Sequence, residues 1–245
     1  MKATLLLPAS LLATVLALSA ATESFSQSHP LSAGGKLSLE NINGNVEIIA
    51  WDKAEVSIEA EKKSSSEEKL KAVQIKVSAS PDKISIRTTH EKRLFSWNNN
   101  VSVTYRVRVP ASTRLDSVET VNGNVKCSGV SGDLHIETVN GSIEASDLQG
   151  NAHLELVNGS VHASASQLPA KARIHIETVN GSCDLALPAD AGAALSAETV
   201  NGKARCELPL ANASTKRNEL SGTLGNGAAS VKLESVNGSV TVRKL

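Results

Sequence analysis

A three-residue motif, Val-Asn-Gly, returns through the second half of the chain, at intervals of 18 to 22 residues over its central copies. Asparagine followed by glycine turns the backbone at low steric cost, because both residues tolerate positive φ. Self-similarity at such a period is typical of a repeat architecture in which equivalent units stack. The copies are Val121-Asn122-Gly123, Val139-Asn140-Gly141, Val157-Asn158-Gly159, Val179-Asn180-Gly181, Val200-Asn201-Gly202 and Val236-Asn237-Gly238, with an early variant at Ile42-Asn43-Gly44.

The residues around each motif alternate between apolar and polar, as in short half-buried strands. Leu134 and Ile136 precede one motif, and Ile143 and Ala145 follow it. Such short strands cannot bury their apolar faces alone, but coils stacked ~4.8 Å apart can. Hairpins are an alternative use of Asn-Gly turns, yet identical residues return at whole-coil spacing, which favours a parallel stack. The valines expected to form one inner column are Val121, Val139, Val157, Val179 and Val200.

A glutamate stands two residues before every motif. In a parallel stack, residues at equivalent positions form columns, so the sequence predicts a column of carboxylates and a column of asparagines. Stacked asparagine amides can hydrogen-bond from one coil to the next, and this structural role explains the asparagines. The glutamates are Glu40, Glu119, Glu137, Glu155, Glu177, Glu198 and Glu234.

Histidines accompany the glutamates in three coils. His135, His153 and His175 each precede a glutamate by two residues, and side chains two apart on a strand share a face. One interpretation is a solvated polar ladder held by His–Glu hydrogen bonds, which a repeat can produce without any function. The other is a Zn²⁺ site, whose nitrogen ligands lie at about 2.0–2.1 Å. The sequence favours the ladder and leaves the metal site as an alternative. The candidate ligands are His135, His153, His175, Glu137, Glu155 and Glu177.

The N-terminal region predicts export. Met1-Lys2 is positive, residues 3–18 are mostly apolar, and small residues follow, which is the layout of a signal peptide. We expect cleavage after Ala20 or Ala21, a location in the periplasm or at the cell surface, and no membrane span afterwards. The predicted segments are a signal peptide at 1–21, a linker at 22–34, a β cap zone at 35–110 and the repeat solenoid at 111–245. Residues 35–245 are expected to form one continuous domain.

The cap zone is expected to cover the open end of the stack, whose exposed strand edge would otherwise invite aggregation. A charged segment at 64–71 predicts a short surface helix. Strands are expected at 45–50, 55–61, 73–79, 83–89 and 101–109. The loop at 91–100 carries Phe95 and Trp97. These two rings either fold back onto the cap or form a contact tip for a partner.

Composition excludes several classes of function. Lys plus Arg equals Asp plus Glu, at 25 each, so there is no electrostatic case for nucleic acid. Aromatics are 2%, which argues against a sugar-binding surface of stacked rings. The cysteines are Cys127, Cys183 and Cys206. In adjacent coils the last two would have Cα atoms roughly 8 Å apart, beyond the limit of about 7 Å for a disulfide, so we predict three buried thiols.

The chain after the signal resembles the bacterial putative-adhesin family of unknown function. The resemblance rests on Gly44-Asn45-Val46-Glu47-Ile48 with Trp51-Asp52, on Arg108-Val109-Pro110, and on the serial Glu-Thr-Val-Asn-Gly-Ser-Ile repeats. It implies a right-handed parallel β-helix that is exported, with no catalytic residues and no cofactor to carry over.

These observations favour a non-catalytic envelope or surface protein, an adhesin-like binding or scaffold module that is not an enzyme. Its expected partner is an envelope protein or a polysaccharide. Two alternatives remain. One is a polysaccharide-active β-helix enzyme, which would use clustered carboxylates. The other is a metal-binding solenoid that uses the His/Glu ladder.

Overall fold

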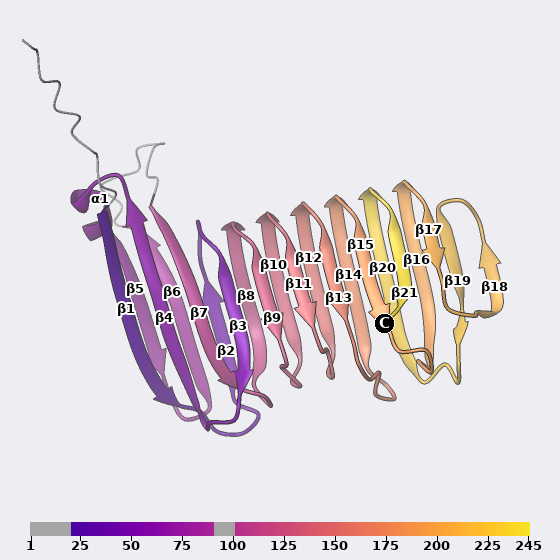
Figure 1. The fold of residues 1–245 in the computed structure, drawn as a ribbon, viewed down its shortest axis with the longest axis horizontal. Helices are drawn as coiled ribbons and strands as arrows, with labels where there is room; N and C mark the ends of the chain where they lie inside the picture. Colours follow the sequence, from indigo (N-terminus) through magenta and orange to yellow (C-terminus); the bar gives the residue numbers. More distant parts are fainter. Residues whose placement is uncertain (1–20, 91–100) are drawn as a thin grey trace, which may run out of the picture.

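The computed structural model describes residues 21–90 and 101–245, so the apolar leader and the loop with Phe95 and Trp97 lie outside the described residues. Two long sheets face each other along an extended stack (Figure 1). Each central coil contributes one strand to each sheet, and the Val-Asn-Gly motif joins the two strands. The predicted all-β solenoid is therefore confirmed.

The first sheet has 10 strands and the second has 11. In spatial order the first contains β1 (Ala21–Pro30), β4 (Glu55–Ser64), β7 (Ser102–Pro110), β3 (Val46–Trp51), β9 (Val125–Ser128), β11 (Ile143–Ser146), β13 (Val161–Ser164), β15 (Cys183–Leu187), β21 (Val240–Lys244) and β17 (Ala204–Cys206). The second contains β18 (Ala211–Thr215), β19 (Glu219–Leu224), β16 (Ala193–Asn201), β20 (Ala229–Asn237), β14 (Arg173–Asn180), β12 (Ala152–Asn158), β10 (Leu134–Asn140), β8 (Arg114–Asn122), β2 (Lys36–Glu40), β6 (Lys83–His90) and β5 (Val73–Ala79).

The core lies between the two sheets and is filled by the predicted alternating residues. Ile143 from the first sheet and Ile136 and Leu154 from the second have no exposed surface. Neighbouring central strands pair in parallel with equivalent residues opposite one another, for example Leu154 with Ile176 and Ile143 with Val161. Aliphatic side chains therefore stack in columns, and a narrow core is built with few aromatic rings.

The motif valines are not in this core, so that prediction was wrong. In the second sheet, strands β8, β10, β12, β14, β16 and β20 continue to the motif asparagine. In β10 the two-residue alternation places Ile136 and Thr138 inward and Val139 outward. Val139 is 38% exposed, whereas Thr138 is 3% exposed. The inner column consists instead of Thr120, Thr138, Leu156, Thr178, Thr199 and Ser235.

The Asn-Gly turns of neighbouring coils lie in direct contact with one another. A Cβ atom built on Gly159 would lie 1.6 Å from the carbonyl oxygen of Gly141, and one on Gly181 would lie 1.5 Å from that of Gly159. Only glycine fits this approach. The motif asparagines form the predicted ladder, in which Nδ2 of each residue donates to Oδ1 of the one before it in the stack. The successive distances are 2.8, 2.8, 3.0, 2.9, 2.8 and 2.9 Å through Asn43, Asn122, Asn140, Asn158, Asn180, Asn237 and Asn201.

The spatial order of the coils differs from their order in the sequence at both ends. Strands β20 and β21, yellow in Figure 1, lie between the β14–β15 coil and the β16–β17 coil. Near the other end, β2 and β3 lie between β6–β7 and β8–β9. Because the coils from β2–β3 to β16–β17 carry the same ladder and turn, the repeat itself does not specify which of them follows which. Neither insertion is predicted by the sequence pattern.

Antiparallel strands close both ends of the stack. The prediction of a linker at 22–34 was wrong, because residues 21–30 form β1, which pairs along its whole length with β4. Its side chains are mostly exposed and polar, as in a linker. Backbone pairing, the partly buried Ala21 and Phe25, and the ion pair of Glu23 with Lys62 at 2.8 Å hold it on the sheet. At the other end β18 pairs with β19, and all its residues are exposed. Polar outer strands protect a sheet edge from further pairing.

The elements expected in the cap zone are present. Strands β3, β4, β5, β6 and β7 match the predicted segments within a few residues, and a short helix, α1 (Glu67–Lys71), lies inside the charged segment. Ser66 caps this helix, since its hydroxyl accepts a hydrogen bond from the Lys69 backbone N–H. Tyr105 of β7 is fully buried, and its hydroxyl lies 2.7 Å from that of Thr88.

Replacing Ile143 by aspartate tests the core. An unpaired charge in this position costs several kcal/mol, so we expect Ile143→Asp to lower the free energy of unfolding by about 4 kcal/mol or more. Urea titration followed by circular dichroism measures this. The control is Glu144→Asp in the same strand, which is exposed and should behave like the parent protein. An unchanged unfolding curve for Ile143→Asp would refute the inward position of Ile143.

The cysteines give a chemical test of burial. Cys127 and Cys183 are buried and Cys206 is half-buried, so the prediction of three buried thiols holds for two of them. Cys206 lies on β17 at the end of the first sheet, where no further coil covers it. Burial raises the pKa of Cys127 and of Cys183 to about 12.

We therefore expect alkylation at pH 8 of the native protein to modify Cys206 well before the other two, since the thiolate is the reactive form. Mass spectrometry of the native and the denatured, unreduced protein checks this. All three thiols should react after denaturation, because no disulfide joins them. Equal rates for all three under native conditions would contradict the burial pattern.

Candidate functional site

The outer face of the second sheet carries two continuous columns of side chains, and we call it the ladder face. In β10, the outward residues are His135, Glu137 and Val139. Parallel register repeats this arrangement in the neighbouring coils. The glutamate column consists of Glu40, Glu119, Glu137, Glu155, Glu177, Glu234 and Glu198. The valine column beside it consists of Ile42, Val121, Val139, Val157, Val179, Val236 and Val200.

A groove with a volume of about 860 Å³ runs along these columns. Its lining residues include the glutamates and the valines, together with the residues between them in each strand. The valines are between 38% and 66% exposed, so the groove presents an unbroken apolar stripe beside a stripe of carboxylates. A contiguous apolar strip on a protein surface often marks a contact site. This strip was not predicted from the sequence, although the two-residue alternation of each strand places the motif valine on the outer face.

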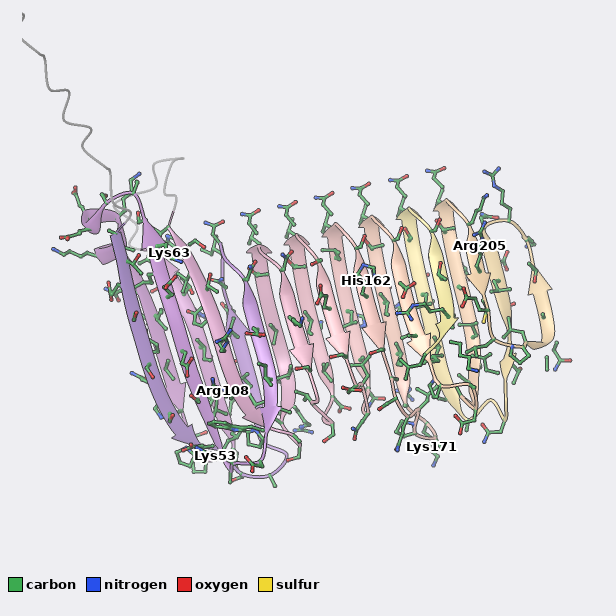
Figure 2. All side chains as sticks on the ribbon, in the orientation of Figure 1. Lys53, Lys63, Arg108, His162, Lys171 and Arg205 are labelled. Atoms are coloured by element: carbon green, nitrogen blue, oxygen red, sulfur yellow. The ribbon has the colours of Figure 1, made fainter. Side chains whose placement is uncertain are left out.

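The outer face of the first sheet is different. Its central positions carry Lys126, Glu144, His162 and Asp184, which lie side by side in the register. Lys126 pairs with Glu144 at 3.3 Å, and Arg243 pairs with Asp184 at 2.7 Å. His162 is labelled on this sheet in Figure 2. Basic and acidic side chains are mixed there, so these positions form no continuous column of one kind.

Most glutamates of the ladder face have a hydrogen-bonding neighbour two residues earlier in the strand. Ser117 contacts Glu119, Ser196 contacts Glu198 at 3.3 Å, and Lys232 contacts Glu234 at 2.7 Å. Stacked carboxylates repel by about 1 kcal/mol at 4 Å in water, and these donors offset that repulsion. In the central coils the donor position is occupied by histidine.

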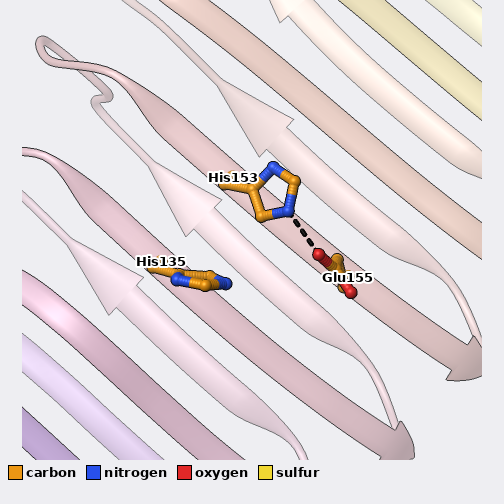
Figure 3. A group of neighbouring side chains, drawn as sticks. All are labelled: His135, His153 and Glu155. Carbon is orange, nitrogen blue, oxygen red and sulfur yellow. Dashed lines mark hydrogen bonds and ion pairs between the residues drawn. The ribbon is translucent and has the colours of Figure 1, made fainter.

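The structure places His135, His153 and His175 directly beside one another on β10, β12 and β14. Their ring centroids are 5.0 and 4.9 Å apart. Nε2 of His153 contacts Oε1 of Glu155 (Figure 3). Nε2 of His175 lies 2.8 Å from Glu177 and 3.1 Å from Glu234. The three imidazoles therefore share one face with the glutamate column, as the spacing predicted.

These side chains form two groups rather than one. The first is His135, His153 and Glu155, and the second is His175, Glu177 and Glu234; in each group the donor atoms lie within 4.8 Å of one another. Glu137 belongs to neither group. Glu234 was not among the predicted ligands, because β20 lies beside β14 only through the insertion of the C-terminal coil.

The two groups differ in their electrostatics. Burial raises the pKa of Glu234, but hydrogen bonds from Lys232 and His175 outweigh it, so its pKa lies below the usual value. A lysine therefore already neutralises the second group. Within the described residues, no lysine or arginine forms an ion pair with Glu137 or Glu155.

In the first group, Nε2 of His135 is buried and lies 2.8 Å from Oε1 of Glu137, but the two atoms lack the geometry of a hydrogen bond. This nitrogen has no hydrogen-bond partner within the described part of the chain. Such an atom is free to accept a different partner, because forming that contact breaks no existing hydrogen bond.

The family model described as Toastrack DUF4097 matches residues 117–243, which span the repeat region from β8 to β21. Among curated proteins, none matches the sequence. Within the described ranges, no helix has the length and hydrophobicity needed to cross a membrane.

Solved structures with a similar architecture include a putative cell adhesion protein from Clostridium sporogenes. It is 14% identical, the match covers 91% of this chain and 100% of that one, and the TM-score is 0.54. A putative adhesin from Bacteroides fragilis and a putative lipid binding protein from Parabacteroides distasonis are each 12% identical. These matches cover 91% of this chain and 97% and 96% of theirs, with TM-scores of 0.32 and 0.30. At such low identity, the first likeness shows a shared fold alone.

Two adjacent residues test which side of the second sheet is the surface. Leu156 is 3% exposed and Val157 is 39% exposed. We expect Leu156→Ser to lower the free energy of unfolding by about 2–5 kcal/mol, because a large side chain leaves the core. Val157→Ser should cost less than about 1 kcal/mol, since an exposed strand position contributes little. Thermal and urea unfolding of both variants provide the measurement; equal losses would contradict the ladder face.

Proposed function

Because the chain belongs to the Toastrack DUF4097 family, we propose that it is a non-catalytic, adhesin-like binding module of the bacterial cell envelope. The observation that carries this proposal is the groove of the ladder face, with its exposed valine column beside the glutamate column. The adhesion-protein description of the Clostridium sporogenes structure agrees with such a role. The signal-peptide layout of residues 1–21 supports export to the periplasm or the cell surface.

The shape of the groove favours an elongated partner. Equivalent residues recur at the strand spacing of ~4.8 Å along the stack axis, so the surface offers the same contact many times over. A partner lying along the axis would bury the valines and place cationic groups against the glutamates. This complementarity would give specificity and speed association more than it adds affinity.

The lining of the groove favours a polypeptide over a polysaccharide. Its residues are aliphatic, acidic or small and polar, and none of them is aromatic. Sugar-binding surfaces usually depend on the flat faces of aromatic rings. We therefore propose an extended segment of an envelope protein that carries lysine or arginine beside aliphatic side chains.

Catalysis is not part of the proposal. A glycoside hydrolase needs two carboxylates with different environments that face each other across the substrate. Here the carboxylates repeat in equivalent positions from coil to coil. Such regularity supports a binding surface rather than a single reactive centre.

Removing the valine column tests the proposal without altering charge. The variant Val139→Ser/Val157→Ser/Val179→Ser should fold, because these side chains are exposed. The parent protein, produced as the mature chain, should bind saturably to washed cell envelopes of the source organism in a sedimentation assay. In the parent protein a bound partner would cover the exposed apolar surface of these three valines. The variant loses this contribution, so it should bind at least tenfold more weakly, which corresponds to about 1.4 kcal/mol.

The matched control is Lys126→Ser/Glu144→Ser/His162→Ser, on the outer face of the first sheet, and it should bind like the parent protein. Protease treatment of the envelopes should abolish binding, whereas digestion of their glycans should not. The proposal fails if the parent protein does not bind saturably or if both triple variants bind equally. Loss of binding after glycan digestion alone would overturn the polypeptide assignment.

A further inference from the structure

We propose that the ladder face holds a transition-metal dication, with Zn²⁺ as the reference ion, at a site formed by His135, His153 and Glu155. Two imidazoles and a carboxylate are a donor set that Zn²⁺ uses in proteins, with the remaining position left for water or a partner group. The site is independent of the proposed envelope partner, because metal binding is measured on the purified protein alone.

The geometry brings the donors close together. Their ligand atoms lie within 4.8 Å of one another, and Nε2 of His153 already contacts Oε1 of Glu155. Around a tetrahedral Zn²⁺ with bonds of about 2.0–2.1 Å, ligand atoms are about 3.4 Å apart, so movements of about an ångström would bring the three donors to these separations. The side chains of His135, His153 and Glu155 are 41%, 36% and 43% exposed, and they have room to rotate. Figure 3 shows both rings on the same face of adjacent strands.

The polar environment also suits a cation. Nε2 of His135 has no hydrogen-bond partner among the residues that the structure describes, so ligation would satisfy it. Glu137 lies beside His135 and Glu155 beside His153. A dication would therefore neutralise two carboxylates of the column and remove part of their mutual repulsion.

The second group, His175 with Glu177 and Glu234, is a weaker candidate. Its donor atoms are equally close, but Nζ of Lys232 lies 2.7 Å from Glu234. A dication there would have to displace this ammonium group or lie next to it. The first group has no such competitor within the described residues, and this difference assigns the site to the coils of β10 and β12.

The residue two positions before the glutamate differs from coil to coil, and this difference restricts the site to the central coils. The residues that occupy the histidine position in other coils are Ser117, Lys232 and Ser196. Serine and lysine are poor ligands for Zn²⁺, so only the central coils present a nitrogen-donor pair. The adjacent imidazoles of His135 and His153 therefore lie in coils whose glutamates have no lysine or arginine partner among the described residues.

Isothermal titration calorimetry of the untagged mature protein with ZnCl₂, NiCl₂ and CuCl₂ tests the proposal. We expect one saturable site with a Kd on the order of 1 to 100 µM for at least Zn²⁺. His153→Ala and His135→Ala should each weaken binding at least tenfold, and so should Glu155→Gln. These side chains are partly exposed, so circular dichroism should show an unchanged fold.

Two matched controls decide where the ion binds. His162→Ala removes a histidine from the same coil as His153, on the outer face of the first sheet, and should change the Kd by less than about twofold. His175→Ala should likewise have little effect. The visible absorption of bound Co²⁺ gives a second readout, and the tetrahedral spectrum should disappear in His153→Ala.

Three outcomes would overturn the proposal. The first is the absence of saturable binding for all three metals up to 1 mM, which would leave the histidines as a hydrogen-bonded ladder. The second is binding that survives His153→Ala. The third is loss of binding in His175→Ala with retention in His135→Ala, which would place the ion in the second group.

Discussion

The close stacking of Asn-Gly turns is the interaction on which the rest of this structure depends. Gly159 and Gly181 approach the carbonyl oxygens of the preceding turns so closely that any Cβ would collide with them. Beside them, each asparagine amide hydrogen-bonds to the next at 2.8–3.0 Å. Together these contacts hold successive coils at the spacing of hydrogen-bonded strands. Without them, the short strands would have no fixed register and could not share a core.

This fixed register gives the surface its chemical character. Where parallel coils keep the same register, every outward position becomes a column, so the protein has a glutamate column and a valine column on one face. Like charges stacked in this way repel, and most coils contain a nearby donor that offsets the repulsion. The histidines occupy this donor position in the central coils. The same placement, two residues before a glutamate, therefore produces both a hydrogen-bonded ladder and a candidate metal site.

The two ends of the stack do not follow the parallel repeat. Strands β1 and β18 run antiparallel to their neighbours and carry polar, exposed side chains. The inserted coils near each end depend on connections that cross over a neighbouring coil. Insertion of β20 beside β14 brings Glu234 next to His175 and adds Lys232 to the same group. The electrostatic difference between the two histidine groups therefore comes from the path of the chain.

The sequence by itself determined the coil, the turn, the asparagine ladder and the alignment of His135 with His153, because these follow from local alternation and an exact return of motifs. The same alternation also determined that Val139 lies on the outer face of its strand. We placed it in the core because we assumed that an apolar residue would be buried. Only the tertiary structure decided the order of the coils, the pairing of residues 21–30 and the position of Glu234. Coils with the same motif have equivalent strand edges, so any of them could pair with any other. The order in which they stack is decided by the connections between coils, and the local sequence pattern does not specify these.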